Sequence, residues 1–203
     1  MPNMDSRKDR TPGPAARKLV ILDRDGVINV DSDQFIKSTD EWVPLPGSLE
    51  AIGRLNQAGY RVVVATNQSG VGRGLFDMAT LGAMHAKMSK LAAAAGGRID
   101  AVFFCPHTSA EGCDCRKPKP GLFQEIARRY EVDLTGVPAV GDSLRDLQAA
   151  AAVGAHPHLV LTGKGKKTQA AGNLPEGTRV HDSLQAFVND MLAEVDAKDA
   201  KGG

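Results

Sequence analysis

Short apolar runs alternate with longer amphipathic stretches along this chain. The runs typical of strands buried on both faces are KLVIL (18–22), RVVVAT (61–66), AVFF (101–104), PAVG (138–141) and HLVLT (158–162). Between them, apolar residues recur at helical spacing, first at Leu49, Ile52 and Leu55 and then over 81–91, 122–130 and 144–155. This alternation predicts an α/β fold, a doubly wound and mostly parallel sheet with helices on both faces.

The two ends of the chain lack this pattern. Residues 1–17 are charged and proline-rich, which predicts a disordered leader, and 194–203 are interpreted as a flexible tail. One domain is therefore expected over 18–193, with the polar stretch 163–178 as a loop inside it. The chain has no apolar run of transmembrane length and no secretion signal at its start, so we expect a cytoplasmic protein without a membrane partner.

Charge and cysteine content narrow the classes of function. The 25 Lys and Arg residues nearly balance the 24 Asp and Glu residues, whereas a dedicated nucleic-acid binder usually has a clear basic excess. An odd number of cysteines, three, argues against a disulfide framework and favours a reducing compartment. We therefore expect no nucleic-acid partner and no structural disulfides.

Carboxylates follow two of the predicted strands. Asp23 and Asp25 come directly after the first strand, and Asp142 follows the fourth. Ligands of such sheets bind beyond the carboxyl ends of the strands, where these side chains should meet. Asp23 and Asp25, two residues apart in an extended segment, point to the same side, and a divalent cation would relieve their repulsion. Mg²⁺ with Asp142 as a further ligand fits best; a pair of aspartates that only cap a turn is the alternative.

All three cysteines lie in the segment CPHTSAEGCDC (105–115). Cys105, His107, Cys113 and Cys115 form a closed set of three thiolates and one imidazole, which is typical of structural zinc. A redox site is the weaker interpretation because the cysteines do not form a C-x-x-C pair, and a loop of unliganded thiols is the third. Because the segment has little to pack, a zinc ion would supply its rigidity.

Four motifs together carry a family resemblance. ILDRDGV, VVATNQSGVGRG, CRKPKPG and VGDSLRDLQAA resemble the successive motifs of the haloacid dehalogenase (HAD) phosphatase superfamily and span roughly residues 18 to 165. The resemblance implies a Mg²⁺-dependent phosphomonoester hydrolase with Asp23 as the nucleophile and Asp25 as the general acid and base. Mg²⁺ would be held by Asp23, Asp142 and the main-chain carbonyl of Asp25.

Further roles follow from the same resemblance. Thr66 and Lys117 would hold the oxygens of the transferring phosphoryl group, with Lys119 as a rival for Lys117. Asp146 would support the site from behind, and a solvated helix residue is its alternative. The chain departs from the pattern at Ser143, where a lysine can follow the motif-four aspartate.

The predicted zinc loop is similar to that of two groups within the superfamily, one acting on heptose bisphosphates and the other on histidinol phosphate. The first is the closer match, although its zinc loop is longer. It implies removal of the 7-phosphate of a heptose 1,7-bisphosphate, a small sugar bisphosphate used on the path to lipopolysaccharide. The segment between Asp25 and Thr66 is too short for a large cap domain, so the zinc loop would form one wall of an open site.

By this resemblance, the residues lining the substrate would be Asp31, Ser32, Asp33, Gln34, Asn67, Gln68, Ser69 and Arg116. Arg116 suits a second anionic end because its planar fork binds bidentately; a surface cation balancing Asp114 is its alternative. We expect a monomer. Two other functions stay open, a histidinol-phosphate phosphatase and an inactive zinc-stabilised binding module.

Overall fold

The computed structural model describes residues 18–200. The leader predicted over 1–17 and the last residues of the predicted tail, 201–203, lie outside the described residues. In chain order the elements are β1 (Leu19–Leu22), α1 (Ser48–Gln57), β2 (Arg61–Asn67), α2 (Ser69–Gly72), α3 (Met78–Ala94), β3 (Ala101–Cys105), the 3₁₀ turn η2 (Ser109–Glu111), α4 (Gly121–Tyr130), β4 (Pro138–Gly141), α5 (Leu144–Ala151), β5 (His156–Val160), α6 (Gly165–Ala171), β6 (Arg179–His181) and α7 (Leu184–Asp199).

The strands form one parallel sheet in the order β3-β2-β1-β4-β5-β6. The predicted α/β class with a doubly wound sheet is therefore confirmed. The chain moves from β1 outward to β3 and then returns to the other side at β4, so the strand order reverses between β1 and β4. A crevice beyond the strand ends at such a reversal is the usual ligand site of these sheets.

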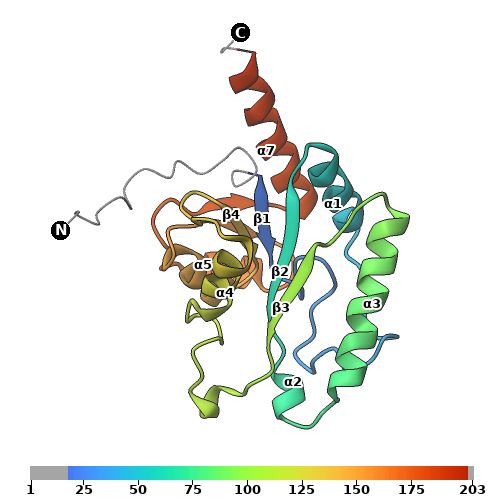
Figure 1. The fold of residues 1–203 in the computed structure, drawn as a ribbon. Coiled ribbons are helices and arrows are strands. Elements are labelled where there is room, and N and C mark those ends of the chain that lie inside the picture. The colour runs from blue at the N-terminus through green and yellow to red at the C-terminus, as the bar shows by residue number, and fades with distance from the viewer. Residues whose placement is uncertain (1–17, 201–203) are drawn as a thin grey trace, which may run out of the picture.

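Helices cover both faces of the sheet, with α1, α3 and α7 on one side and α4 and α5 on the other (Figure 1). Side chains of β1 alternate between the two layers, because Val20 and Leu22 join the first apolar cluster while Leu19 and Ile21 join the second. All four are at most 3% exposed. Burial on both faces explains why β1 has an unbroken apolar sequence and makes it a rigid base for the residues that follow it.

Two segments differ from their prediction. The stretch 163–178, expected to be a loop, contains α6, whose sequence GKKTQAA carries little helical apolar pattern. Tertiary contact decides its position, since an added Cβ at Gly165 would lie 1.8 Å from the carbonyl oxygen of Val160. Helix α7 continues through Asp199, past residue 193 at which the domain was expected to end.

Helix α7 is anchored at its first turns, where Leu184, Phe187 and Val188 are buried in the core, and its far end extends beyond the sheet (Figure 1). Within residues 18–200 no second domain covers the carboxyl edge of the sheet, in agreement with the predicted lack of a large cap. In the same range, no helix combines the length and the apolar character that crossing a bilayer requires.

Candidate active site and metal centres

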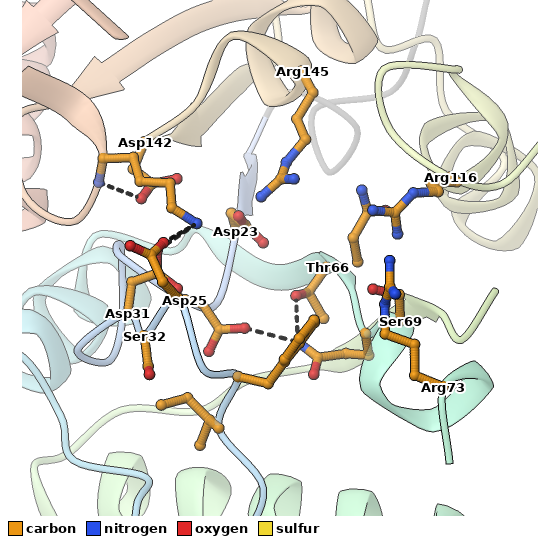
Figure 2. Close-up of a pocket in the computed structure, with 16 residues that line it drawn as sticks. Asp23, Asp25, Asp31, Ser32, Thr66, Ser69, Arg73, Arg116, Asp142 and Arg145 are labelled. Carbon is orange, nitrogen blue, oxygen red and sulfur yellow. Dashed lines mark hydrogen bonds and ion pairs between the residues drawn. The ribbon is translucent and has the colours of Figure 1, made fainter. Parts of the chain in front are cut away.

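A polar pocket lies at the carboxyl ends of β1, β2 and β4 (Figure 2). Its lining residues are Asp23, Asp25, Asp31, Ser32, Asp33, Phe35, Ile36, Thr66, Asn67, Gln68, Ser69, Arg73, Arg116, Asp142, Arg145 and Lys164. The pocket therefore gathers most of the residues predicted for catalysis and substrate binding, although they come from segments far apart in the sequence. Gln34 is the exception among the predicted lining residues, because it lies outside this pocket.

Lys117 lies buried behind Asp23 and does not line the pocket. Its ammonium group is 3.0 Å from Asp23 Oδ1 and 2.7 Å from Asp146 Oδ1, and it donates a 2.7 Å hydrogen bond to the carbonyl oxygen of Ala65. Asn67 fixes the main chain of Lys117 through two 3.1 Å hydrogen bonds, one accepted from its N–H and one donated to its carbonyl. Lys117 is thus a fixed positive charge against the pair Asp23 and Asp146.

Asp25 is held in one orientation by three neighbours. Arg24, whose side chain is fully buried, donates to both carboxylate oxygens through Nη2, at 2.9 and 3.0 Å. Asn29 Nδ2 donates to Oδ1 and Gln68 Nε2 to Oδ2, each at 2.9 Å. Gln68 Nε2 also donates to Thr66 Oγ1 at 2.9 Å, so that Asp25 and Thr66 face the pocket in a fixed relation.

The carboxylate of Asp142 lies against two glycines, Gly26 and Gly163. An added Cβ would lie 2.0 Å from Asp142 Oδ2 at Gly26, and 2.2 Å from it at Gly163. The backbone N–H of Lys164 donates to the same oxygen at 2.8 Å. Only glycine leaves room for this carboxylate at both places, and both glycines also have positive φ.

The aspartates at the pocket floor repel one another electrostatically. Burial, with a further contribution from Asp146 and Asp25, raises the pKa of Asp23 to about 6 although Lys117 opposes this. Burial, followed by the charges of Asp146 and Asp23, raises the pKa of Asp142 to about 8. Carboxylates that resist ionisation in this way are stabilised by a bound cation.

The donor set fits a divalent cation. Carboxylate oxygens of Asp23, Asp142 and Asp146 lie within 4.8 Å of one another. Asp146 is already engaged, because it pairs with Lys117 and accepts hydrogen bonds from the N–H and hydroxyl of Ser143. Asp23 and Asp142 are therefore the carboxylates best placed to hold the ion, as predicted from the sequence for Mg²⁺. Asp146 is buried and is not a solvated helix residue.

Three basic residues of the pocket were not recognised from the sequence: Arg73, Arg145 and Lys164. Lys164 Nζ pairs with Asp31 at 3.0 Å and Asp33 at 3.5 Å, which joins the loop after β5 to the loop after β1. No sequence signal places Lys164 there, since only the sheet order brings these loops together. Arg73 and Arg145 lie inside two of the four family motifs, and this location could have indicated that they reach the pocket.

The four residues predicted to bind zinc come together where β3 ends at Cys105 and in the loop that leads from it to α4. The Sγ atom of Cys105 is 3.6 Å from both His107 Nδ1 and Cys113 Sγ, and Cys115 Sγ is 3.3 Å from His107 Nδ1 and 3.5 Å from Cys113 Sγ. Tetrahedral zinc with Zn–S bonds of about 2.3 Å requires ligand separations of about 3.5–3.8 Å. All three cysteines are free thiols, so the arrangement fits zinc and not a disulfide.

The two candidate lysines of this loop, Lys117 and Lys119, lie in different environments. Lys119 Nζ lies on its surface, 3.0 Å from Asp114 Oδ1, whereas Lys117 reaches Asp23. Arg116 lines the pocket and donates from Nη1 to the carbonyl oxygen of His107 at 3.3 Å. Asp114 is thus balanced by Lys119, and Arg116 connects the thiol cluster to the pocket wall.

The parallel sheet and the aspartate pocket at its switch point define an α/β protein with a polar site suited to a divalent cation. The family model of haloacid dehalogenase-like hydrolases matches residues 14–154, and the chain belongs to this family.

Among curated proteins, the D-glycero-beta-D-manno-heptose-1,7-bisphosphate 7-phosphatase of Bordetella bronchiseptica is 64% identical over 177 residues, covering 87% of this chain and 99% of that protein. The protein of the same name from Pseudomonas aeruginosa is 55% identical over the same shares of the two chains. The B. bronchiseptica D,D-heptose 1,7-bisphosphate phosphatase, whose crystal structure was solved with magnesium and phosphate, superposes with a TM-score of 0.86 over 87% of this chain and 99% of that one, at 64% identity.

Proposed function

We propose that this protein is a Mg²⁺-dependent phosphatase that removes the 7-phosphate of D-glycero-β-D-manno-heptose 1,7-bisphosphate, a step toward the heptose of lipopolysaccharide. The single observation that carries the chemistry is Asp23 in a pocket with Asp142, backed by the buried ammonium of Lys117. The substrate is supported by relatives of that name that are up to 64% identical over nearly their whole length.

In the proposed reaction a carboxylate oxygen of Asp23 attacks phosphorus and the ester oxygen of the sugar leaves. Lys117 holds Asp23 in position, and its positive charge favours the ionised nucleophile. Asp25 gives its proton to the leaving oxygen and then takes one from the water that hydrolyses the aspartyl-phosphate. Its contacts with Arg24 and Gln68 keep its carboxyl group aimed into the pocket.

Two metal sites support this role. Asp23 and Asp142, with the main-chain carbonyl of Asp25, would hold Mg²⁺, which supplies positive charge for the phosphoryl oxygens when it is bound. Cys105, His107, Cys113 and Cys115 would hold structural zinc and so fix the wall that carries Arg116. We further propose that the enzyme is a cytoplasmic monomer, and its free thiols are consistent with the reducing cytoplasm.

The test is phosphate release from the α and β anomers of heptose 1,7-bisphosphate and from histidinol phosphate, with Mg²⁺ added to Mg²⁺-free protein. We expect turnover of a heptose bisphosphate to exceed that of histidinol phosphate by orders of magnitude in kcat/KM. Preferential hydrolysis of histidinol phosphate would assign the enzyme to the other group. A protein that binds zinc but hydrolyses none of the three would be the inactive binding module.

A further inference from the structure

Arg145 stands in the first turn of α5 and reaches into the pocket. Figure 2 shows its guanidinium directed from above toward the region of Asp23. Its Nε atom is buried and has no hydrogen-bond partner, and among residues 18–200 no carboxylate forms an ion pair with it. The terminal nitrogens of the guanidinium also form no hydrogen bond with residues 18–200, so the end of the side chain that lines the pocket is open to a ligand.

The surroundings of Arg145 are negative, yet none of the acids touches it. Burial acts to lower the pKa of Arg145, but the charges of Asp146, Asp23, Asp142 and Asp31 raise it, so the guanidinium is fixed in its charged form. Its donors thus face the centre of the pocket while the acids around it are engaged elsewhere. An anion placed between Arg145 and the floor would meet a fork of free N–H groups.

The other cations of the site have their donors in use. The three N–H groups of Lys117 are directed at Asp23, Asp146 and Ala65. Lys164 is paired with Asp31 and Asp33.

Toward the rim, Arg116 donates to the carbonyl oxygen of His107, and the guanidinium of Arg73 lies 5.8 Å from the ring centre of Phe35. The Ser143 hydroxyl, beside Asp142 in the sequence, is turned to Asp146 and does not line the pocket. Within the described chain, Arg145 is therefore the half-buried cation of the pocket whose donors are available to a ligand.

We propose that Arg145 is a substrate-binding residue that donates hydrogen bonds to oxygens of the phosphoryl group being transferred. This inference rests on the proposed phosphatase function and assigns a second positive contact to the same group. A planar guanidinium can contact two phosphoryl oxygens at once from the pocket side, while Lys117 holds the nucleophile from behind. The arrangement explains why a residue without any partner of its own is kept at the start of α5.

The test measures binding of inorganic phosphate, which does not depend on the identity of the sugar. Phosphate affinity would be determined by calorimetry, and as competitive inhibition of p-nitrophenyl phosphate hydrolysis, at saturating Mg²⁺. The variants are Arg145→Gln and Arg145→Lys, with Arg128→Gln as a matched control because Arg128 pairs with Glu125 on α4, outside the pocket. Melting temperatures of all variants establish that they fold.

For Arg145→Gln we expect phosphate binding weakened about ten- to a hundredfold, as for the loss of a charged hydrogen-bond pair. Arg145→Lys should recover part of the loss and Arg128→Gln should show none. Unchanged phosphate affinity in Arg145→Gln, with the wild type active as a phosphatase, would overturn only the assignment of Arg145. If Arg145→Gln weakens only the turnover of bisphosphate substrates and leaves phosphate affinity unchanged, the assignment is likewise overturned. Arg145 would then contact the phosphate that the substrate retains. A wild type that neither binds phosphate nor hydrolyses its esters would refute the proposed function as well.

Discussion

Gly26 determines how close Asp142 can come to the end of β1. Its φ is +80°, and an added Cβ would lie 2.0 Å from Asp142 Oδ2. In Gly26→Ala, the backbone strain alone costs about 1–2 kcal/mol, and the carboxylate of Asp142 must also leave its position against residue 26. We expect a lower melting temperature together with a Mg²⁺ requirement for activity at least tenfold higher, measured by titrating Mg²⁺ in a phosphate-release assay.

Gly82→Ala is the matched control for this substitution. Gly82 lies inside α3, and an added Cβ would meet no atom within 4 Å. Alanine there should stabilise the protein by about 1 kcal/mol through helix propensity and leave the Mg²⁺ requirement unchanged. An unaltered Mg²⁺ titration in Gly26→Ala would contradict the placement of Asp142 as a metal ligand.

Asp23→Asn separates the chemistry of this position from its place in the fold. We expect kcat to fall by at least about 10³-fold, because an amide cannot form the phosphoenzyme. The fold should survive, since burial already disfavours the charged form of Asp23 and Lys117 keeps its contacts with Asp146 and Ala65. The measurement pairs turnover with thermal unfolding. Asp40→Asn, an exposed change outside the pocket, should alter neither, and residual turnover near the wild-type value in Asp23→Asn would exclude Asp23 as the nucleophile.

At the scale of elements, the loop between β3 and α4 has few internal contacts apart from the thiol cluster. Around that cluster, the Glu111 carboxylate accepts a hydrogen bond from the Thr108 backbone N–H, and Lys119 pairs with Asp114, both at the exposed surface. Exposed pairs of this kind contribute little to stability. Zinc bound by the cluster would therefore stabilise this part of the loop and the position of Arg116. Lys117 is also held by its own contacts with Asn67, Asp23 and Asp146.

Cys113→Ser tests this dependence. We expect zinc content to fall from one equivalent to well below one, the melting temperature to drop by several degrees, and kcat/KM to fall at least about tenfold because the residues that follow the cluster lose their position. Metal analysis, thermal unfolding and kinetics on one preparation measure all three. Ser109→Ala, in the exposed η2 turn of the same loop, should retain zinc, stability and activity. Full stability with normal zinc in Cys113→Ser would show that the metal, if present, is held elsewhere.

The elements that the sequence predicted best are those that are buried on both faces. The first strand was expected over 18–22 and β1 spans Leu19–Leu22; the second was expected over 61–66 and β2 ends one residue later. The β6 strand was not predicted because RVH is only three residues long and lies at the sheet edge. Helices α6 and α7 were not predicted, since their positions depend on contacts with β5 and the core and not on a strong apolar period.

For the whole molecule, the sequence placed the aspartates well and the cations poorly. Asp23, Asp25 and Asp142 follow strands, and a parallel sheet must bring strand ends to one edge. Lys164 comes from the loop after β5 and meets Asp31 only because the sheet continues past β4. The thiol cluster was predictable from spacing alone because its ligands lie within one loop. Residues that reach a site from a distant loop give no local signal.

The buried acids also predict how the stability of the whole protein depends on pH when Mg²⁺ is absent. The pKa of Asp142 is raised to about 8 by burial and then by Asp146 and Asp23, so the folded state holds a proton there that the unfolded state has lost. The contribution of this proton to the free energy of unfolding is fully present below pH 4 and is lost as the pH rises through 8. His158, whose pKa is lowered to about 3 by burial and by His156 and His181, acts oppositely but only below about pH 6.5.

Between pH 6.5 and 8 His158 no longer opposes the effect of Asp142. Asp23, which acts in the same direction as Asp142, contributes mainly below this interval because its pKa is about 6. Because the zinc-binding thiols titrate alike in both proteins, the effect of Asp142 is the difference between the wild type and Asp142→Asn, each zinc-loaded and Mg²⁺-free. The free energy of unfolding of the wild type, relative to that variant, should fall by up to roughly 1.4 kcal/mol per pH unit across this interval. Saturating Mg²⁺ should remove this difference in slope, because the bound ion keeps both carboxylates of the wild type charged. Urea unfolding at several pH values measures it. Equal slopes for the wild type and Asp142→Asn without Mg²⁺ would mean that another group binds the proton.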